Sequence, residues 1–446
     1  MRIAMIGTGY VGLVSGVCFS DFGHEVVCVD KIAAKVEALQ AGHVPIYEPG
    51  LEAMMAANVA AGRLSFTTDL AEAVAEAEAV FIAVGTPTRR GDGHADLKFV
   101  YAAAEEIAGA LQGPTLVVVK STVPVGTNRE VARVIAAARP EADFDVASNP
   151  EFLREGAAIE DFMRPDRVVV GVETDRARAA MEAIYRPLSL REAPVVFTDL
   201  DSAEITKYAA NAFLAMKITF INEIAALCEA VGGDVQQVAK GIGLDKRIGG
   251  KFLHPGPGYG GSCFPKDTSA LARIGQDHAR PLRLVETTIE VNAGIKRRMI
   301  DKILELCGDS VNGKRIAVLG VTFKPDTDDM REAPALTVVP ALVGGGADLR
   351  VTDPEGRKEG EALLPGVTWY PDAYTAAEGA DAVVILTEWN AFRALDLDRL
   401  ARIMRTPRMA DLRNVYDPDT ARAAGFAYIG VGRGRPDEPA GAERVA

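Results

Sequence analysis

One cysteine stands in a setting that is typical of a reactive thiol. Residues 256–267 read GPGYGGSCFPKD, with four glycines ahead of Cys263 and a proline, a lysine and an aspartate soon after it. Glycines let a backbone turn tightly and approach a ligand closely, and the segment after the cysteine predicts a helix start. A helix N-terminus and a neighbouring lysine both lower a thiol pKa, so the pattern favours a thiolate nucleophile. The alternative is an ordinary glycine-rich turn around a small buried cysteine.

A lysine and an amide form a second candidate pair. Lys207 and Asn211 lie four residues apart in the longest helical pattern of the chain, from Asp201 to about Gly232. This spacing places both side chains on one helix face. The pattern is apolar on most faces, where polar groups are costly unless they meet a charge or an oxyanion. We expect the pair to bind a negatively charged oxygen; the alternative is a surface lysine beside a capping amide.

The N-terminal residues combine a glycine motif with an acid at a fixed offset. A short apolar run at 2–6 leads into GTGYVG at 7–12, then a helical pattern, a second apolar run at 25–29, and Asp30. A strand, G-x-G-x-x-G, helix, strand and acid in this order predict a dinucleotide site with the pyrophosphate at the helix N-terminus. Asp30 would hydrogen-bond the adenosine ribose and repel a 2′-phosphate, which favours NAD over NADP.

Other apolar runs end in polar turns. Strands are expected at 79–84, 115–119 and 145–148, and they lead to Thr86, Thr122 and the NPEFLREG segment at 149–156. Parallel sheets gather their ligands at the carboxyl ends of the strands. The alternatives are plain helix capping for the two threonines and a solvated pair for the two glutamates of the NPEFLREG segment.

The opening pattern returns in the second half of the chain. Residues 315–320 resemble residues 2–7, residues 349–353 repeat a strand closed by an acid, and residues 381–387 resemble the run at 79–84. We therefore predict an α/β protein with two Rossmann-like doubly wound domains, joined by a long central helix and a helical dimerisation region. In place of the glycine motif, the second domain has a turn that presents Lys324 to an anion. The expected boundaries are 1–200 for the NAD-binding domain, 201–308 for the helical domain with the cysteine loop, 309–433 for the second doubly wound domain, and 434–446 for a disordered tail.

The composition excludes several classes of protein. A chain of 446 residues predicts two or three domains. The 62 acidic and 49 basic residues give a net charge of −13, which argues against a nucleic-acid or anionic-membrane surface. Five widely spaced cysteines without C-x-x-C indicate a reducing cytoplasm and no zinc site or disulfide framework. No apolar run is long enough to cross a membrane, and the glycine spacing after Arg2 argues against a signal peptide.

Several of these motifs resemble those of one family. GGSCFPKD at 260–267, NPEFLREG at 149–156 and KYAAN at 207–211 are similar to motifs of the UDP-glucose 6-dehydrogenases, in the UDP-glucose/GDP-mannose dehydrogenase family. The glycine motif at 7–12 and the Phe323-Lys324-Pro325 turn resemble that family too. The likeness covers the chain up to its tail. GDP-mannose dehydrogenases usually carry leucine where this chain has Phe264, so the glucose enzymes are the better match.

The resemblance implies a double oxidation of UDP-glucose to UDP-glucuronate that consumes two NAD. Cys263 would capture the intermediate aldehyde as a thiohemiacetal, and a second oxidation would give a thioester that water cleaves. Lys207 and Asn211 would steady the oxygen of the intermediates. Asp267 and Glu151, with Thr122 beside them, would assist proton transfer and water activation.

The resemblance also implies two sets of binding residues in a homodimeric cytoplasmic enzyme without a metal. The NAD set is Gly7, Gly9, Tyr10, Val11, Gly12, Asp30, Lys35, Thr86, Thr122, Glu155, Lys266 and Arg331. The UDP-sugar set is Glu151, Phe152, Leu153, Arg154, Glu155, Lys207, Asn211, Phe252, Leu253, His254, Pro255, Gly256, Gly260 and Lys324, with Arg247 contributed by a neighbouring subunit.

Two other classes of protein remain open on the sequence. A two-electron dehydrogenase of the hydroxyacyl or 6-phosphogluconate kind shares a Rossmann domain followed by helices, but it would need no thiol. An NAD-sensing or scaffold protein would have no reason to keep Cys263, Lys207 and Asn211 together. The number of NADH formed per sugar consumed separates the three: two, one or none.

Overall fold

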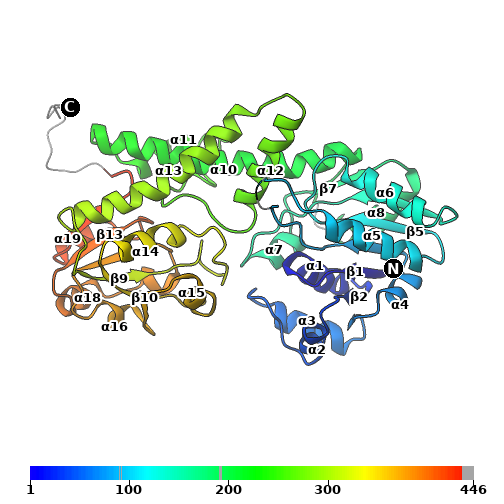
Figure 1. Cartoon of the computed structure of the whole chain (residues 1–446), viewed down its shortest axis with the longest axis horizontal. Coiled ribbons are helices and arrows are strands. Elements are labelled where there is room, and N and C mark those ends of the chain that lie inside the picture. The colour runs from blue at the N-terminus through cyan, green and yellow to red at the C-terminus, as the bar shows by residue number, and fades with distance from the viewer. Residues whose placement is uncertain (90, 92, 190–192, 434–446) are drawn as a thin grey trace. The chain divides into compact units, whose positions relative to one another are not determined.

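The computed structural model describes residues 1–89, 91, 93–189 and 193–433. The predicted disordered tail at 434–446 lies outside these residues. The chain divides into two compact units, each with its own sheet (Figure 1). Unit 1 comprises Met1–Ala210 and Arg273–Ala279, and unit 2 comprises Asn211–Ala272 and the chain from Arg280 onward.

Unit 1 contains an eight-stranded sheet in the order β3-β2-β1-β4-β5-β6-β7-β8. All neighbouring strands are parallel except β6 and β7. The central strands β4 and β5 are buried along their whole length, as expected for parallel strands covered on both faces. The strands are β1 (Arg2–Ile6), β2 (Glu25–Val29), β3 (Leu64–Thr67), β4 (Ala79–Ile82), β5 (Thr115–Val119), β6 (Phe144–Ser148), β7 (Val168–Val172) and β8 (Val195–Thr198).

Helices cover both faces of this sheet. Successive residues of β1 enter different cores: Met5 packs in a cluster with Phe19 of α1, while Ile6 packs in a cluster with Ile107 of α5. This alternation is the two-residue period of a strand covered on both faces. The helices of unit 1 are α1 (Tyr10–Asp21), α2 (Ala33–Gln40), α3 (Leu51–Ala60), α4 (Leu70–Ala75), α5 (Lys98–Ala110), α6 (Thr127–Ala138), α7 (Ala158–Met163), α8 (Asp175–Ile184) and α9 (Arg186–Ser189).

The predicted long helix is α10 (Leu200–Val231), a continuous segment of 32 residues. It contains neither glycine nor proline, the two residues that most disfavour a helix interior. Gly232 follows with φ +79°, a left-handed conformation that commonly ends helices at glycine. The first part of α10 belongs to unit 1 and the rest to unit 2.

Unit 2 contains a six-stranded, fully parallel sheet in the order β11-β10-β9-β12-β13-β14. This order reproduces β3-β2-β1-β4-β5-β6 of unit 1, so the second doubly wound domain predicted from the repeated pattern is confirmed. The strands are β9 (Arg315–Leu319), β10 (Asp348–Thr352), β11 (Thr368–Trp369), β12 (Ala382–Ile385), β13 (Arg408–Asp411) and β14 (Ala427–Gly430).

The remaining helices follow α10 in the chain. None of the helices within the described residues is both long and apolar enough to span a membrane. Helix α12 begins immediately after Cys263, as the sequence predicts, and its last residues belong to unit 1. The helices are α11 (Val235–Gly243), α12 (Phe264–Asp277), α13 (Arg283–Leu306), α14 (Ala335–Gly344), α15 (Arg357–Leu363), α16 (Ala373–Ala377), α17 (Asn390–Arg393), α18 (Leu397–Ile403) and α19 (Pro418–Ala423).

Candidate active site

The first turn of unit 1 has the geometry that a dinucleotide requires. Gly7 follows β1 with φ +103°, and a Cβ there would lie 2.6 Å from the carbonyl oxygen of Ala83. A Cβ at Gly12 would collide with the carbonyl oxygen of Gly7, whereas a Cβ at Gly9 would meet open space. Two glycines thus permit a tight turn and close packing of α1, while the third leaves the approach to the helix N-terminus clear. These residues fit NAD with its pyrophosphate at the start of α1, near Tyr10 and Val11.

Asp30 stands at the end of β2 as a charged acceptor. It accepts hydrogen bonds from the Thr8 N–H at 3.1 Å and the Thr8 hydroxyl at 2.7 Å, and Lys35 Nζ lies 3.0 Å from the same oxygen. Burial alone would raise the pKa of Asp30, but these donors and the Ile32 N–H outweigh it and lower the pKa to about 2. The carboxylate is therefore ionised, as a ribose acceptor must be. Asp30 and Lys35, both in the NAD set, lie together.

A buried glutamate that the sequence analysis did not identify fastens α1 to the NPEFLREG segment. Glu48 accepts a hydrogen bond from the Tyr10 hydroxyl, and it accepts the Gly156 N–H at 2.7 Å and the Ala158 N–H at 2.8 Å. Burial and Glu48 raise the pKa of Tyr10, so the phenol stays protonated and can donate. No local motif marks Glu48, because its partners lie between 38 and 110 residues away in the chain.

Glu151 and Lys207 form a buried ion pair within unit 1. Lys207 Nζ lies 2.9 Å from Glu151 Oε1, and the two side chains are 3% and 6% exposed. Burial would raise the pKa of Glu151, but the charge of Lys207 and the Leu153 N–H outweigh it and lower the pKa. The Lys207 ammonium also lies 5.2 Å from the centre of the Phe152 ring. Glu151 is thus a buried carboxylate, not one of a solvated pair.

Lys120 is a buried cation beside this pair that the sequence analysis also missed. Its Nζ donates to Asn149 Oδ1 at 3.1 Å, and the Tyr185 hydroxyl donates to the same oxygen at 2.6 Å. Burial lowers the pKa of Lys120 to about 8, although the charge of Glu151 opposes this shift. Lys120 and Glu151 line one small pocket. Two lysines therefore surround one carboxylate in unit 1.

The other residues predicted at the strand ends of unit 1 range from buried, as Thr86 is, to exposed. Thr86 donates its hydroxyl proton to the Thr122 carbonyl oxygen at 3.0 Å, so the turns after β4 and β5 are joined. Arg154 is exposed and pairs with Asp161 at 2.6 Å. Glu155 is partly buried in the same NPEFLREG segment.

Unit 2 places Cys263 immediately before α12. The thiol is partly exposed, whereas the other four cysteines are buried. Its carbonyl oxygen accepts the Asp267 N–H at 2.8 Å, which closes the first helical turn. The Ser262 hydroxyl oxygen lies 3.5 Å from the Cys263 sulfur. Burial raises the pKa of Cys28 to about 12 and raises that of Cys228 and Cys307 as well, so those thiols stay protonated.

Three of the predicted polar residues meet one turn beyond the thiol. Asn211 Nδ2 donates to Asp267 Oδ2 at 2.6 Å, and Lys266 Nζ lies 2.6 Å from Asp267 Oδ1. Both Asn211 and Asp267 are buried. Asp267 therefore has one donor on each carboxylate oxygen. These two contacts fix the orientation of its carboxylate in the first turn of α12.

The residues predicted to hold the UDP-sugar in unit 2 come from separate segments. The 252–256 loop approaches β13 at its end, since a Cβ on Gly256 would lie 3.3 Å from the Leu412 carbonyl oxygen. Arg413, which the sequence analysis missed, donates to the Phe323 carbonyl oxygen at 2.9 Å and so fixes the turn that carries Lys324. Arg247 is 90% exposed and pairs with Asp245 at 2.6 Å.

The structure thus assigns the predicted site residues to two sets. Unit 1 holds the glycine turn, Asp30, Lys35, Thr86, Thr122, the NPEFLREG segment and Lys207. Unit 2 holds Asn211, Arg247, the 252–256 loop, Gly260, Cys263, Lys266, Asp267, Lys324 and Arg331. Within the described part of the chain, no cluster of three or more histidine, cysteine or acidic side chains could hold a metal ion.

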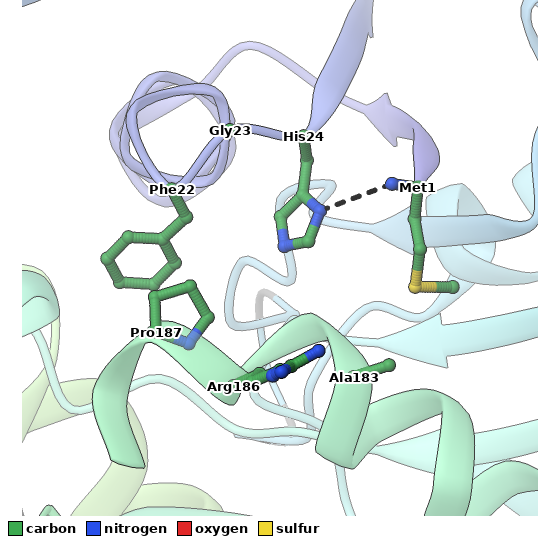
Figure 2. Close-up of a pocket in the computed structure, with 7 residues that line it drawn as sticks. All are labelled: Met1, Phe22, Gly23, His24, Ala183, Arg186 and Pro187. Atoms are coloured by element: carbon green, nitrogen blue, oxygen red, sulfur yellow. Dashed lines mark hydrogen bonds between the residues drawn. The ribbon is translucent and has the colours of Figure 1, made fainter. Parts of the chain in front are cut away.

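A surface hollow in unit 1 lies away from these residues. Figure 2 shows its lining, which includes Met1, His24 and Arg186. The N-terminal nitrogen lies 3.5 Å from His24 Nδ1, and His24 Nε2 lies 2.9 Å from the Ile184 carbonyl oxygen. Met1 precedes β1, so the hollow is at the amino end of that strand, whereas the glycine turn is at its carboxyl end.

The glycine turn, the ionised acid at the end of β2 and the two doubly wound sheets are the features expected of an NAD-dependent oxidoreductase. Comparison with known proteins gives the family. Residues 1–189 match the NAD binding domain, residues 201–294 the central domain and residues 317–418 the UDP binding domain of the UDP-glucose/GDP-mannose dehydrogenase family. The chain belongs to this family, which confirms the resemblance, the fold class and the use of NAD.

Individual relatives agree over nearly the whole chain. A UDP-glucose 6-dehydrogenase of Rhizobium meliloti is 62% identical over 435 residues, covering 97% of this chain and 100% of that protein. UDP-glucose 6-dehydrogenase TuaD of Bacillus subtilis is 47% identical over 97% of this chain and 93% of its own length. The solved UDP-glucose dehydrogenase of Pyrobaculum islandicum superimposes with a TM-score of 0.90 at 40% identity, and 97% of each chain is covered.

Proposed function

We propose that this protein oxidises UDP-glucose to UDP-glucuronate in two successive NAD-dependent steps through a covalent intermediate on Cys263. The observation that carries the proposal is the partly exposed thiol at the start of α12, followed at once by the Lys266–Asp267–Asn211 cluster. The identity of 62% to a UDP-glucose 6-dehydrogenase supports the choice of substrate.

In the first oxidation the C6 hydroxyl of the sugar loses its proton to the protein, and the C6 carbon would release a hydride. NAD, when bound, supplies the hydride acceptor for both oxidations. Glu151 is ionised by its pairing with Lys207, so it is available as the proton acceptor, directly or through water held by Thr122. The product of this step is an aldehyde.

The second oxidation begins when the Cys263 thiolate adds to the aldehyde carbon. The carbonyl oxygen takes a proton and a thiohemiacetal forms, with Lys207 and Asn211 as donors to that oxygen. Loss of the hydride and of the hydroxyl proton then gives a thioester. Water adds to the thioester carbon, the carbon–sulfur bond breaks, and the thiolate leaves with the acid as product. Asp267, oriented by Asn211 and Lys266, is the proposed acceptor for the proton of this water.

We also infer a division of labour along the chain. Residues 1–200 bind NAD, residues 201–308 supply the thiol and the oxyanion donors, and residues 309–433 bind the UDP group through Lys324. The match of residues 317–418 to a UDP binding domain supports the last assignment. The five free cysteines support a reducing, cytoplasmic location.

We infer a homodimer from an apolar stripe on α10. Phe213, Phe220, Leu227 and Val231 are between 48% and 61% exposed, and their spacing of seven, seven and four residues places them on one helix face. Contiguous exposed apolar residues mark an interaction surface. The exposed Arg247 would then reach the substrate of the second subunit. Sedimentation equilibrium should show a dimer that Phe213→Glu together with Phe220→Glu dissociates.

The number of NADH formed per sugar consumed tests the proposed reaction. We expect two NADH per UDP-glucose, with UDP-glucuronate as product. A value of one with an accumulating aldehyde would indicate a two-electron dehydrogenase. A value of zero with retained NAD binding would indicate a sensor or scaffold.

A further inference from the structure

The loop that carries Cys263 is enclosed by side chains and backbone to which the proposed chemistry assigns no role. Three of its glycines approach other parts of unit 2 so closely that no side chain could replace their hydrogen. A Cβ on Gly258 would lie 2.5 Å from Asn292 Oδ1, a Cβ on Gly261 would lie 2.7 Å from the Phe323 ring, and a Cβ on Gly260 would collide with the Glu332 carbonyl oxygen. The loop therefore has contacts on several sides within its own unit.

Asn292 on α13 binds both backbone groups of one loop residue. Its Oδ1 accepts the Tyr259 N–H at 2.9 Å, and its Nδ2 donates to the Tyr259 carbonyl oxygen at 3.1 Å. This pairing resembles the two bonds that a neighbouring strand would supply. Asn292 is buried, so neither backbone group could turn to water if the amide were removed.

Lys296, one helical turn further along α13, contacts the loop through residues 331 and 332. Its Nζ donates to the Glu332 carbonyl oxygen at 3.0 Å. Glu332 has φ +51°, a left-handed conformation that is strained for a non-glycine residue and persists only where surrounding contacts maintain it. The preceding residue, Arg331, accepts the Gly261 N–H at 2.8 Å through its carbonyl oxygen. Lys296 thus maintains the turn on which Gly260 and Gly261 rest.

We propose that Asn292 and Lys296 are positioning residues that set the place of the Cys263 sulfur for capture of the aldehyde. They act through the backbone of residues 259–261, two to four positions before the thiol. The inference rests on the proposed role of Cys263 as the nucleophile. Capture must occur before the aldehyde leaves, and a displacement of about 1 Å between reacting atoms can cost ~10²-fold in rate. A loop rich in glycine has little stiffness of its own, so α13 supplies it.

Matched variants on α13 test this role. Asn292→Leu and Lys296→Met remove the hydrogen bonds while keeping side-chain size, and Arg297→Met removes a cation from the next, exposed position of the same helix. We expect both loop variants to form UDP-glucuronate at least ~10-fold more slowly and to release aldehyde, which a hydrazine reagent traps. NADH per sugar consumed should fall from two towards one, with the KM for UDP-glucose unchanged. Arg297→Met should match the wild type, and Lys296→Arg, which keeps a donor, should restore much of the yield.

Hydrogen exchange gives a second measurement that does not depend on activity. The Tyr259 and Gly261 amides should exchange faster in both loop variants, because their acceptors are lost or freed to move. Unchanged exchange with wild-type turnover would overturn the proposal. A second result would also overturn it: turnover falls only in proportion to a lower Tm, and the NADH formed per sugar stays at two. A purely structural role of these residues predicts that result. Formation of UDP-glucuronate by Cys263→Ala would instead refute the proposed function. Hydrogen exchange of the loop amides would still show whether Asn292 and Lys296 hold the loop.

Discussion

The first strand–turn–strand segments of the two units share a hydrogen-bond pattern but differ in the chain that follows the turn. In each, a threonine follows the first strand, and its N–H donates to an aspartate at the end of the second: Thr8 to Asp30 at 3.1 Å in unit 1, and Thr322 to Asp353 at 3.1 Å in unit 2. The strand orders around them correspond as well. The glycine turn of unit 1, however, leads into α1 within three residues, whereas α14 of unit 2 begins only at Ala335.

The two aspartates differ in what surrounds them. Asp30 keeps a lysine, Lys35, as an ion-pair partner and remains at the edge of the turn. Asp353 accepts backbone N–H groups of Val321 at 2.6 Å and Gly356 at 2.8 Å, and the Trp389 indole nitrogen lies 3.3 Å from it. The same supersecondary structure therefore pairs its acid with a lysine side chain in one unit and bonds it to several backbone N–H groups in the other. The strand order alone does not define a dinucleotide site, because the chain after the first strand differs between the two units.

The largest effect should come from a residue outside both turns. Cys263→Ala should abolish UDP-glucuronate formation, a loss of at least ~10³-fold because no other group can hold the aldehyde carbon. Titration calorimetry should show unchanged affinities for NAD and UDP, since the two nucleotide turns are untouched. Acid quenching of the wild type during turnover should leave a sugar-nucleotide adduct on the peptide with Cys263. Near-normal acid formation by the variant would return this thiol to a packing role.

Asp353→Ala should damage stability, and it should do so in unit 2. Several buried N–H groups would lose their acceptor, and each unsatisfied group costs ~1–3 kcal/mol. We expect a lower Tm with the NAD dissociation constant nearly unchanged. Asp398→Ala, at an exposed position of the same unit, serves as the control. A large loss of NAD affinity in the folded Asp353 variant would show that the two turns are not as different as the geometry indicates.

Lys324→Ala should weaken binding of the sugar nucleotide and leave binding of NAD nearly unchanged. Removing a charged donor to a phosphate costs ~1.5–3 kcal/mol, so the KM for UDP-glucose should rise by roughly 10- to 100-fold. The KM for NAD should stay within a factor of about two, because Lys324 belongs to unit 2 and the glycine turn to unit 1. An unchanged KM for the sugar nucleotide would remove Lys324 from the site.

Asp30→Ala should have a smaller effect, on the cofactor alone. We expect a weakening of NAD by about tenfold, from the loss of a charge-assisted hydrogen bond to the ribose, and a narrower gap to NADP. Fluorescence titration with the two reduced cofactors measures both quantities. Equal use of NAD and NADP by the wild-type protein would contradict the role given to this carboxylate.

The smallest predicted effect is the contribution of Asp30 to stability at low pH. Its folded pKa of about 2 is below the unfolded value of 3.8, so its contribution is fully present above pH 3.8 and is lost as the pH falls through about 2. The loss should be at most about 2 kcal/mol, because the group is partly screened by solvent. Comparison of acid denaturation for the wild type and Asp30→Asn measures it. If the stability curves of the two proteins run parallel between about pH 4 and about pH 2, Asp30 contributes nothing to the pH dependence of stability.

Local patterns in the sequence were sufficient for the fold class and for many of the candidate residues. The glycine spacing at 7–12, the buried strands and the repeated pattern after residue 315 predicted both sheets, because a turn that needs glycine and a strand covered on both faces leave strong local signals. The glycine-rich approach and the helix start likewise identified Cys263. The catalytic and binding roles of the individual residues stay predictions.

Only the tertiary structure decided which polar groups are buried and what they meet. Glu48, Lys120, Asn292 and Lys296 carry no local signal, since each acquires its role from a segment about thirty to a hundred residues away in the chain. The local sequence pattern around a helical lysine is the same whether the side chain faces water or a carbonyl oxygen. The difference arises when packing removes water from around it, because an interior hydrogen bond then has no solvent competitor. For the same reason, the sequence repeats an aspartate in both units, but only the surrounding fold shows that Asp30 faces an open turn and Asp353 a closed one.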